Sequence, residues 1–155
     1  MKSSKTLILL ICLIVFSCAK EKENPIKTYH TTWQHYLGDP EQTHYSTLQQ
    51  IDTSNIAGLE LAWSYKSGGL EEGRTTQIQT NPMIIDKVLY GVNAALELFA
   101  LNAATGEEIW SFEPPASNDS GLGVNRGLSF WESQGEEPDR IFFSSGSNLF
   151  AINLL

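Results

Sequence analysis

The sequence predicts an all-β fold, a partial β-propeller of about one and a half blades. Three observations support this prediction. Between residues 82 and 112, short apolar runs alternate with Gly, Asn, Asp and Pro, as in antiparallel strands joined by tight turns. Residues 100–110 have the pattern of a hairpin, with Asn102 and Gly106 in its turn. A related pattern returns after about 50 residues, a typical length for a propeller blade.

The chain begins with the pattern of an export signal. Lys2 and Lys5 precede an apolar run over 7–16, which is too short to span a bilayer of about 30 Å as a helix. The run leads into Ser17-Cys18, and residues 15–18 resemble the lipobox of bacterial lipoproteins. This resemblance implies that Cys18 becomes the lipidated first residue. An ordinary secretory peptide that is cut nearby is the alternative.

These features divide the chain into three parts. We expect a lipoprotein signal peptide over 1–17, a polar tether over 18–28 and the N-terminal part of an incomplete propeller over 29–155. The lipid would hold the protein on a membrane of the bacterial cell envelope, facing the periplasm or the cell surface. Cys12 and Cys18 are the only cysteines, so a mature lipoprotein would have no thiol for a disulfide, a zinc site or a nucleophile.

The composition excludes some functions. With 41% hydrophobic residues among 155, the chain can bury a core. A net charge of −8 without a basic stripe argues against a nucleic-acid partner. The three histidines, His30, His35 and His44, match no compact metal-ligand motif, and no cysteine joins them.

The apolar runs predict the strands of one blade. Residues 59–65 alternate imperfectly and predict a strand that ends at a Ser-Gly-Gly turn. Residues 82–85 and 88–92 predict a hairpin around Asp-Lys, and residues 98–101 and 108–112 complete a four-stranded antiparallel unit.

A second copy of this pattern follows. Residues 87–93 return as residues 140–146, and residues 98–102 return as residues 149–153. The second copy stops before the turn that follows Asn102 in the first. We therefore expect either the N-terminal piece of a larger protein or a truncated reading frame. In both cases we expect the piece to aggregate on its own through unpaired strand edges.

The hairpin at 100–110 fits the pattern Ala-x-Asn/Asp-x-x-Thr-Gly-x-x-x-Trp. This pattern resembles the tryptophan-docking repeat of quinoprotein dehydrogenases, enzymes that carry pyrroloquinoline quinone (PQQ) in an eight-bladed propeller. The resemblance assigns structural docking roles to five residues, which are Ala100, Asn102, Thr105, Gly106 and Trp110.

The stretch from Trp33 to Tyr65 also resembles this family. Its matching residues have the order and spacing of the opening segment of PQQ-dependent alcohol and glucose dehydrogenases, and they are Trp33, Tyr36, Gly38-Asp39, Tyr45-Ser46, Leu48, Gln50-Ile51, Asn55, Leu59 and Ala62–Tyr65. The departures are Leu37, where the family usually has Gly, and Thr47, where it usually has Pro.

Two residues are candidates for cofactor binding by this resemblance. Residues 125–131 are similar to a family stretch whose Arg contacts the cofactor, which implies that Arg126 binds PQQ. Gln79 stands three residues before Pro82, where many members have a Glu that touches the cofactor. Ser120-Gly121 replace the vicinal cysteines of methanol and alcohol dehydrogenases, which favours the sugar-oxidising branch.

The resemblance implies a membrane-anchored dehydrogenase that oxidises glucose or another sugar or alcohol and passes electrons to a quinone or cytochrome. Its general base and most ligands of its Ca²⁺ lie in later blades of the family fold. No position of this chain matches them, so we assign no catalytic and no metal residue. The alternative is a non-enzymatic propeller lipoprotein, similar to an outer-membrane assembly scaffold that shares the docking repeat and binds no PQQ.

Overall fold

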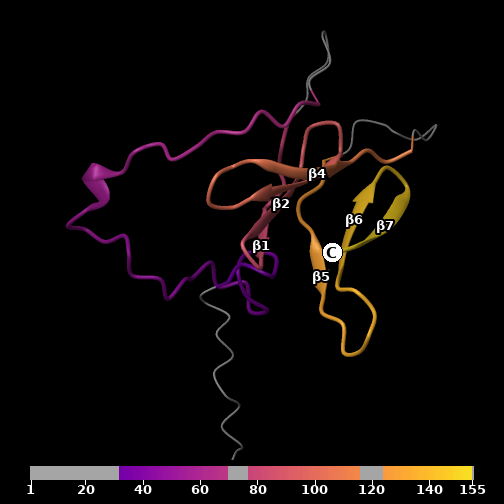
Figure 1. Ribbon diagram of the computed structural model, residues 1–155, viewed down its shortest axis with the longest axis horizontal. Helices are drawn as coiled ribbons and strands as arrows, with labels where there is room; N and C mark the ends of the chain where they lie inside the picture. Colours follow the sequence, from indigo (N-terminus) through magenta and orange to yellow (C-terminus); the bar gives the residue numbers. More distant parts are fainter. Residues whose placement is uncertain (1–31, 70–76, 116–123, 155) are drawn as a thin grey trace, which may run out of the picture.

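The computed structural model describes residues 32–69, 77–115 and 124–154, and its strands form two antiparallel sheets (Figure 1). One short 3-10 helix, η2 (Ile56–Gly58), precedes them. The first sheet contains, in order, β1 (Met83–Ile85), β2 (Val88–Val92), β3 (Leu98–Asn102) and β4 (Glu108–Phe112). The second sheet contains, in order, β5 (Ser129–Trp131), β6 (Arg140–Ser145) and β7 (Asn148–Asn153). The predicted all-β fold and its four-stranded unit are confirmed.

Tight turns join the strands of the first sheet as the sequence predicts. Asp86 and Lys87 have φ angles of 47° and 69°, the pair of left-handed residues of a type I′ hairpin. In the turn between β3 and β4, the Asn102 Oδ1 accepts hydrogen bonds from the N–H groups of Ala104 at 2.9 Å and Thr105 at 3.2 Å. This side-chain contact explains why Asn suits the turn.

The two sheets pack face to face through aromatic rings. Phe112 of β4 lies 6.1 Å from Phe143 of β6 and 5.6 Å from Phe150 of β7, measured between ring centroids. Phe143 and Phe150 stack at 5.3 Å. The surrounding core is buried in both sheets, with Leu98 and Ile141 inaccessible to solvent. Burial of this apolar area is the main force that holds the sheets together.

An extended segment covers the opposite face of the first sheet. The Trp63 ring lies on Gly106, where an added Cβ would be 2.4 Å from the ring. Tyr65 lies 5.1 Å from Phe99 between ring centroids, and its hydroxyl donates to the Glu108 carboxylate at 2.5 Å. The first sheet is therefore in contact on both faces.

The strand predicted over residues 59–65 is wrong. The segment is extended, but no described strand pairs with it, and Leu61 is 83% exposed. Its contacts with the first sheet come from side chains and loops instead. Just beyond it, the Ser67 carbonyl accepts a 2.8 Å hydrogen bond from the buried Asn93 side chain, and Gly69 lies against the same loop. Apolar alternation alone does not make a strand without a partner.

The predicted repeat is confirmed in its spacing but not in its register. Tyr90 pairs with Ala100 in the first sheet, whereas Ala151, the counterpart of Ala100, pairs with Phe142. Tyr90 therefore corresponds to Phe142 and not, as predicted, to Phe143. A shift of one residue moves every side chain of a strand to the other face. Phe143 accordingly lies on the face that meets the first sheet.

The predicted signal peptide, the predicted lipidation site Cys18, the predicted tether and His30 fall outside the described residues, as do Ser120 and Gly121. Within the described ranges, no helix is both long and apolar enough to cross a membrane.

Replacing Gly106 with Ala should destabilise the protein. Gly106 has a φ of 73°, a left-handed conformation that is costly for Ala, and the new methyl group would collide with the Trp63 ring. We expect the free energy of unfolding, measured by urea denaturation of the whole protein that contains this chain, to fall by about 2–4 kcal/mol. Gly135→Ala is the matched control, because no atom lies within 4 Å of its added Cβ. Equal losses in the two variants would contradict the Trp63–Gly106 contact.

Alkaline pH should weaken the contact between Tyr65 and Glu108. Burial, the hydrogen bond to Glu108 and its negative charge raise the pKa of Tyr65 from 10.0 to about 12. The folded protein thus holds this proton more tightly than the unfolded chain, so the stabilisation is complete below pH 10 and disappears as the pH rises toward 12. The free energy of unfolding, measured by urea denaturation of the whole protein, should fall more steeply between pH 10 and pH 12 in the native protein than in Tyr65→Phe. Parallel curves would refute the shift.

Candidate cofactor site

The two segments that carry the predicted cofactor residues are hydrogen-bonded to each other. Asn81 and Gly127 form a parallel β-bridge. The Arg126 carbonyl accepts hydrogen bonds from the Asn81 backbone N–H at 3.1 Å and from its Nδ2 at 3.2 Å. The Thr80 hydroxyl donates to the Asn125 carbonyl at 2.8 Å. These hydrogen bonds join residues that are 45 apart in the sequence. They lie just before β1 in one segment and just before β5 in the other.

Gln79 and Arg126 therefore belong to one locality. Gln79 is half-buried and stands two residues before the bridging Asn81, whereas Arg126 is exposed. Among the side chains of the described ranges, none forms an ion pair with the Arg126 guanidinium. An exposed guanidinium of this kind can bind a carboxylate through two parallel hydrogen bonds. A neighbouring amide adds donors and an acceptor without charge.

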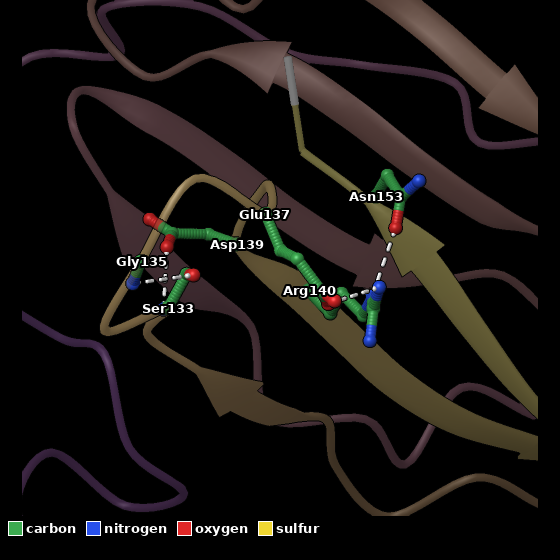
Figure 2. Close-up of polar contacts among 6 residues, drawn as sticks. All are labelled: Ser133, Gly135, Glu137, Asp139, Arg140 and Asn153. Carbon is green, nitrogen blue, oxygen red and sulfur yellow. Dashed lines mark hydrogen bonds and ion pairs between the residues drawn. The ribbon is translucent and has the colours of Figure 1, made fainter.

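Arg140 is used differently. Its Nη2 pairs with the Glu137 carboxylate at 2.8 Å, and its Nε donates to the Asn153 Oδ1 at 3.0 Å (Figure 2). Its guanidinium also lies over the Trp131 ring, 5.4 Å from the ring centroid. In the loop between β5 and β6, the Ser133 N–H donates separately to the Asp139 carboxylate at 2.8 Å (Figure 2). All of these contacts stabilise the second sheet. Of the two arginines that the structure describes, Arg126 is the one available for a ligand.

A buried asparagine fixes the backbone on both sides of Arg126. Asn125 is 5% exposed. Its Oδ1 accepts the Gly127 N–H at 2.9 Å, and its Nδ2 donates to the Ser144 carbonyl of β6 at 3.1 Å. Sequence reasoning missed this role, although the residue lies within the motif that indicated Arg126.

The opening segment of the described chain packs against the residues next to Arg126 and against β1. A Cβ on Gly127 would lie 2.4 Å from the Tyr36 ring, so only glycine fits there. Trp33 exchanges two backbone hydrogen bonds with Ile84 of β1, at 2.9 and 3.4 Å. The segment thus contacts β1 and the residues that lead into β5. Leu37 stands in the left-handed region with a φ of 60°, a conformation that suits the Gly expected at this position from the resemblance.

Two further polar side chains, those of Asp39 and Tyr90, have structural roles. Asp39 is buried and accepts hydrogen bonds from the Thr43 N–H at 2.9 Å and from the Thr43 hydroxyl. Burial and the charge of Asp86 raise the pKa of Tyr90, which faces Trp110 inside the sheet. In the part of the chain that the structure describes, no group of three or more His, Cys, Asp or Glu residues could hold a metal ion.

Comparison with known proteins identifies the fold and the family. Residues 33–154 match the β-propeller domain of glucose, ethanol and alcohol dehydrogenases that is named for PQQ. The quinohemoprotein alcohol dehydrogenase of Comamonas testosteroni is 32% identical over 101 residues, which cover 62% of this chain and 14% of that protein. The quinoprotein glucose dehydrogenase of Escherichia coli is 33% identical over 109 residues, which cover 67% of this chain and 14% of that protein.

Solved structures agree. The crystal structure of the Comamonas testosteroni enzyme superposes with a TM-score of 0.68 at 25% identity, covering 83% of this chain and 18% of that one. A europium-containing methanol dehydrogenase shares the fold, with a TM-score of 0.62 at 23% identity over 79% of this chain and 21% of that one.

The chain spans about a seventh of the length of these curated relatives. The match nevertheless includes both sheets, the bridge between Asn81 and Gly127, and the opening segment. The chain belongs to the quinoprotein alcohol and glucose dehydrogenase family and forms part of its PQQ β-propeller domain.

Proposed function

We propose that this chain supplies part of the cofactor site of a PQQ-dependent dehydrogenase, with Arg126 as its main contact. The observation that carries the proposal is the backbone bridge at Arg126, which holds an exposed guanidinium next to the Gln79 segment. PQQ is a planar quinone with three carboxylates, and it supplies the two-electron oxidation of the substrate when bound.

The donor set fits this cofactor. The Arg126 guanidinium would bind a carboxylate of PQQ as a charged fork, and the Gln79 amide would add a neutral hydrogen bond. The hydrogen bonds to the Arg126 carbonyl fix the backbone before binding, so little conformational freedom is lost when the ligand arrives. The role of these residues is to bind and orient the cofactor, and no base is assigned to this chain.

The substrate proposed is glucose or another sugar or alcohol. Relatives are named for both glucose and alcohol oxidation. Ser120-Gly121, in place of vicinal cysteines, favour a sugar. We further propose that Ca²⁺ accompanies PQQ, held mainly by residues outside this chain, and that a quinone or cytochrome accepts the electrons.

The proposed location is the bacterial cell envelope. The export signal and the lipobox-like residues 15–18 support a lipid on Cys18, with residues 18–28 as the tether. The propeller would then face the periplasm or the cell surface.

Removal of the Arg126 guanidinium should weaken PQQ binding. We expect Arg126→Ala to raise the Kd for PQQ about 10- to 100-fold, because a charge-assisted hydrogen-bonded pair is lost. Arg126→Lys should give an intermediate Kd, since it keeps the charge but not the fork. The measurement is fluorescence titration with PQQ and Ca²⁺ of the whole protein that contains this chain.

Arg140→Ala is the matched control for this titration. It removes a guanidinium that is already bound to Glu137 and Asn153, so it should lower thermal stability and leave the Kd for PQQ unchanged. An unchanged Kd in Arg126→Ala would reject the proposed contact. A protein that binds no PQQ at all would favour the scaffold alternative.

Cys18→Ala should release the protein from the membrane. Without the thiol no lipid can be attached, and a single-residue change of this kind leaves the propeller sequence intact. We expect metabolic labelling with a radioactive fatty acid to mark the native protein and not the variant. Labelling that persists in Cys18→Ala would show that the lipidation site is elsewhere.

A further inference from the structure

We propose that Asn125 is a positioning residue for Arg126, one that orients the guanidinium toward the cofactor by clamping the backbone around it. This inference rests on the proposed contact between Arg126 and PQQ. Asn125 itself need not touch the cofactor, because its side chain is buried and its polar atoms are engaged within the protein.

The amide of Asn125 links Arg126 to the second sheet. The Oδ1 accepts the N–H of Gly127, so the side chain closes a turn around Arg126. The Nδ2 donates to the carbonyl of Ser144 at 3.1 Å, and Ser144 pairs with Leu149 inside the sheet. The position of the turn is thereby tied to a strand rather than to a loop, which gives a more precise placement of a binding residue.

The backbone of the same turn is bonded to the segment that leads into β1 of the first sheet. The Asn125 carbonyl accepts the Thr80 hydroxyl, and the Arg126 carbonyl accepts two hydrogen bonds from Asn81. Arg126 is thus flanked by bonds to β6 of the second sheet and to the segment that leads into β1, while its own side chain is exposed. A small movement of one sheet against the other would move the guanidinium with it.

Asparagine is the side chain that satisfies this arrangement. The site needs an acceptor for the Gly127 N–H and a donor for the Ser144 carbonyl on one short side chain. Asp lacks the donor, and Gln is longer by one methylene group. Ser can still accept the Gly127 N–H but cannot span the distance to Ser144.

The test measures Kd for PQQ, in the presence of Ca²⁺, by fluorescence titration of the whole protein. We expect Asn125→Ala to raise the Kd about tenfold, the lower end of the effects known for residues that orient ligands in metal sites. Asn125→Ser should raise it less, because it keeps half of the clamp. Asn93→Ala is the matched control, since Asn93 is equally buried and bonds to a loop and a neighbouring segment away from Arg126.

A double-mutant cycle separates positioning from general damage. If Asn125 acts through Arg126, Asn125→Ala should raise the Kd in the native background and leave it unchanged in Arg126→Ala. Thermal melts of all variants establish that they fold. If Asn125→Ala does not fold, the Kd of Asn125→Ser is used in its place.

The outcomes distinguish the two proposals. An unchanged Kd in Arg126→Ala rejects the proposed function. A raised Kd in Arg126→Ala keeps the proposed function. The positioning role alone is then overturned if Asn125→Ala raises the Kd equally in the native and Arg126→Ala backgrounds, or if it raises the Kd no more than Asn93→Ala does.

Discussion

The packing of Phe112 against Phe143 and Phe150 sets the relative position of the two sheets, and the candidate site depends on that position. The segments that lead into β1 and β5 lie side by side where the two sheets meet, and direct hydrogen bonds join them. Their bridge, between Asn81 and Gly127, then holds Arg126 in place. Apolar packing between the sheets thus helps to supply the geometry that polar groups need to bind a ligand.

Side-chain packing also covers the opposite face of the first sheet, the one that does not meet the second sheet. Trp63 and Tyr65 cover that face without forming a strand, through the contact with Gly106 and the hydrogen bond to Glu108. Sheets of a propeller are apolar on both faces, so each face needs a neighbour. In this chain an extended segment provides the neighbour on one side of the first sheet and the second sheet provides it on the other.

Local patterns predicted the hairpins well, because turn residues such as Asp86-Lys87 and Asn102 act within a few positions of the chain. The register of the repeat and the predicted strand over 59–65 failed, since both depend on which segment lies alongside. The motif around Arg126 indicated the site residue, but not how it is held. Asn125 could not be given its role from sequence, because its partners, Thr80 and Ser144, lie 45 and 19 positions away.

The most direct test is a crystal structure of the whole protein that contains this chain, solved with PQQ bound. We expect the Arg126 guanidinium to contact a carboxylate of the cofactor and the bridge between Asn81 and Gly127 to be intact. A structure in which PQQ binds away from Arg126, or in which the two segments are separated, would contradict this expectation.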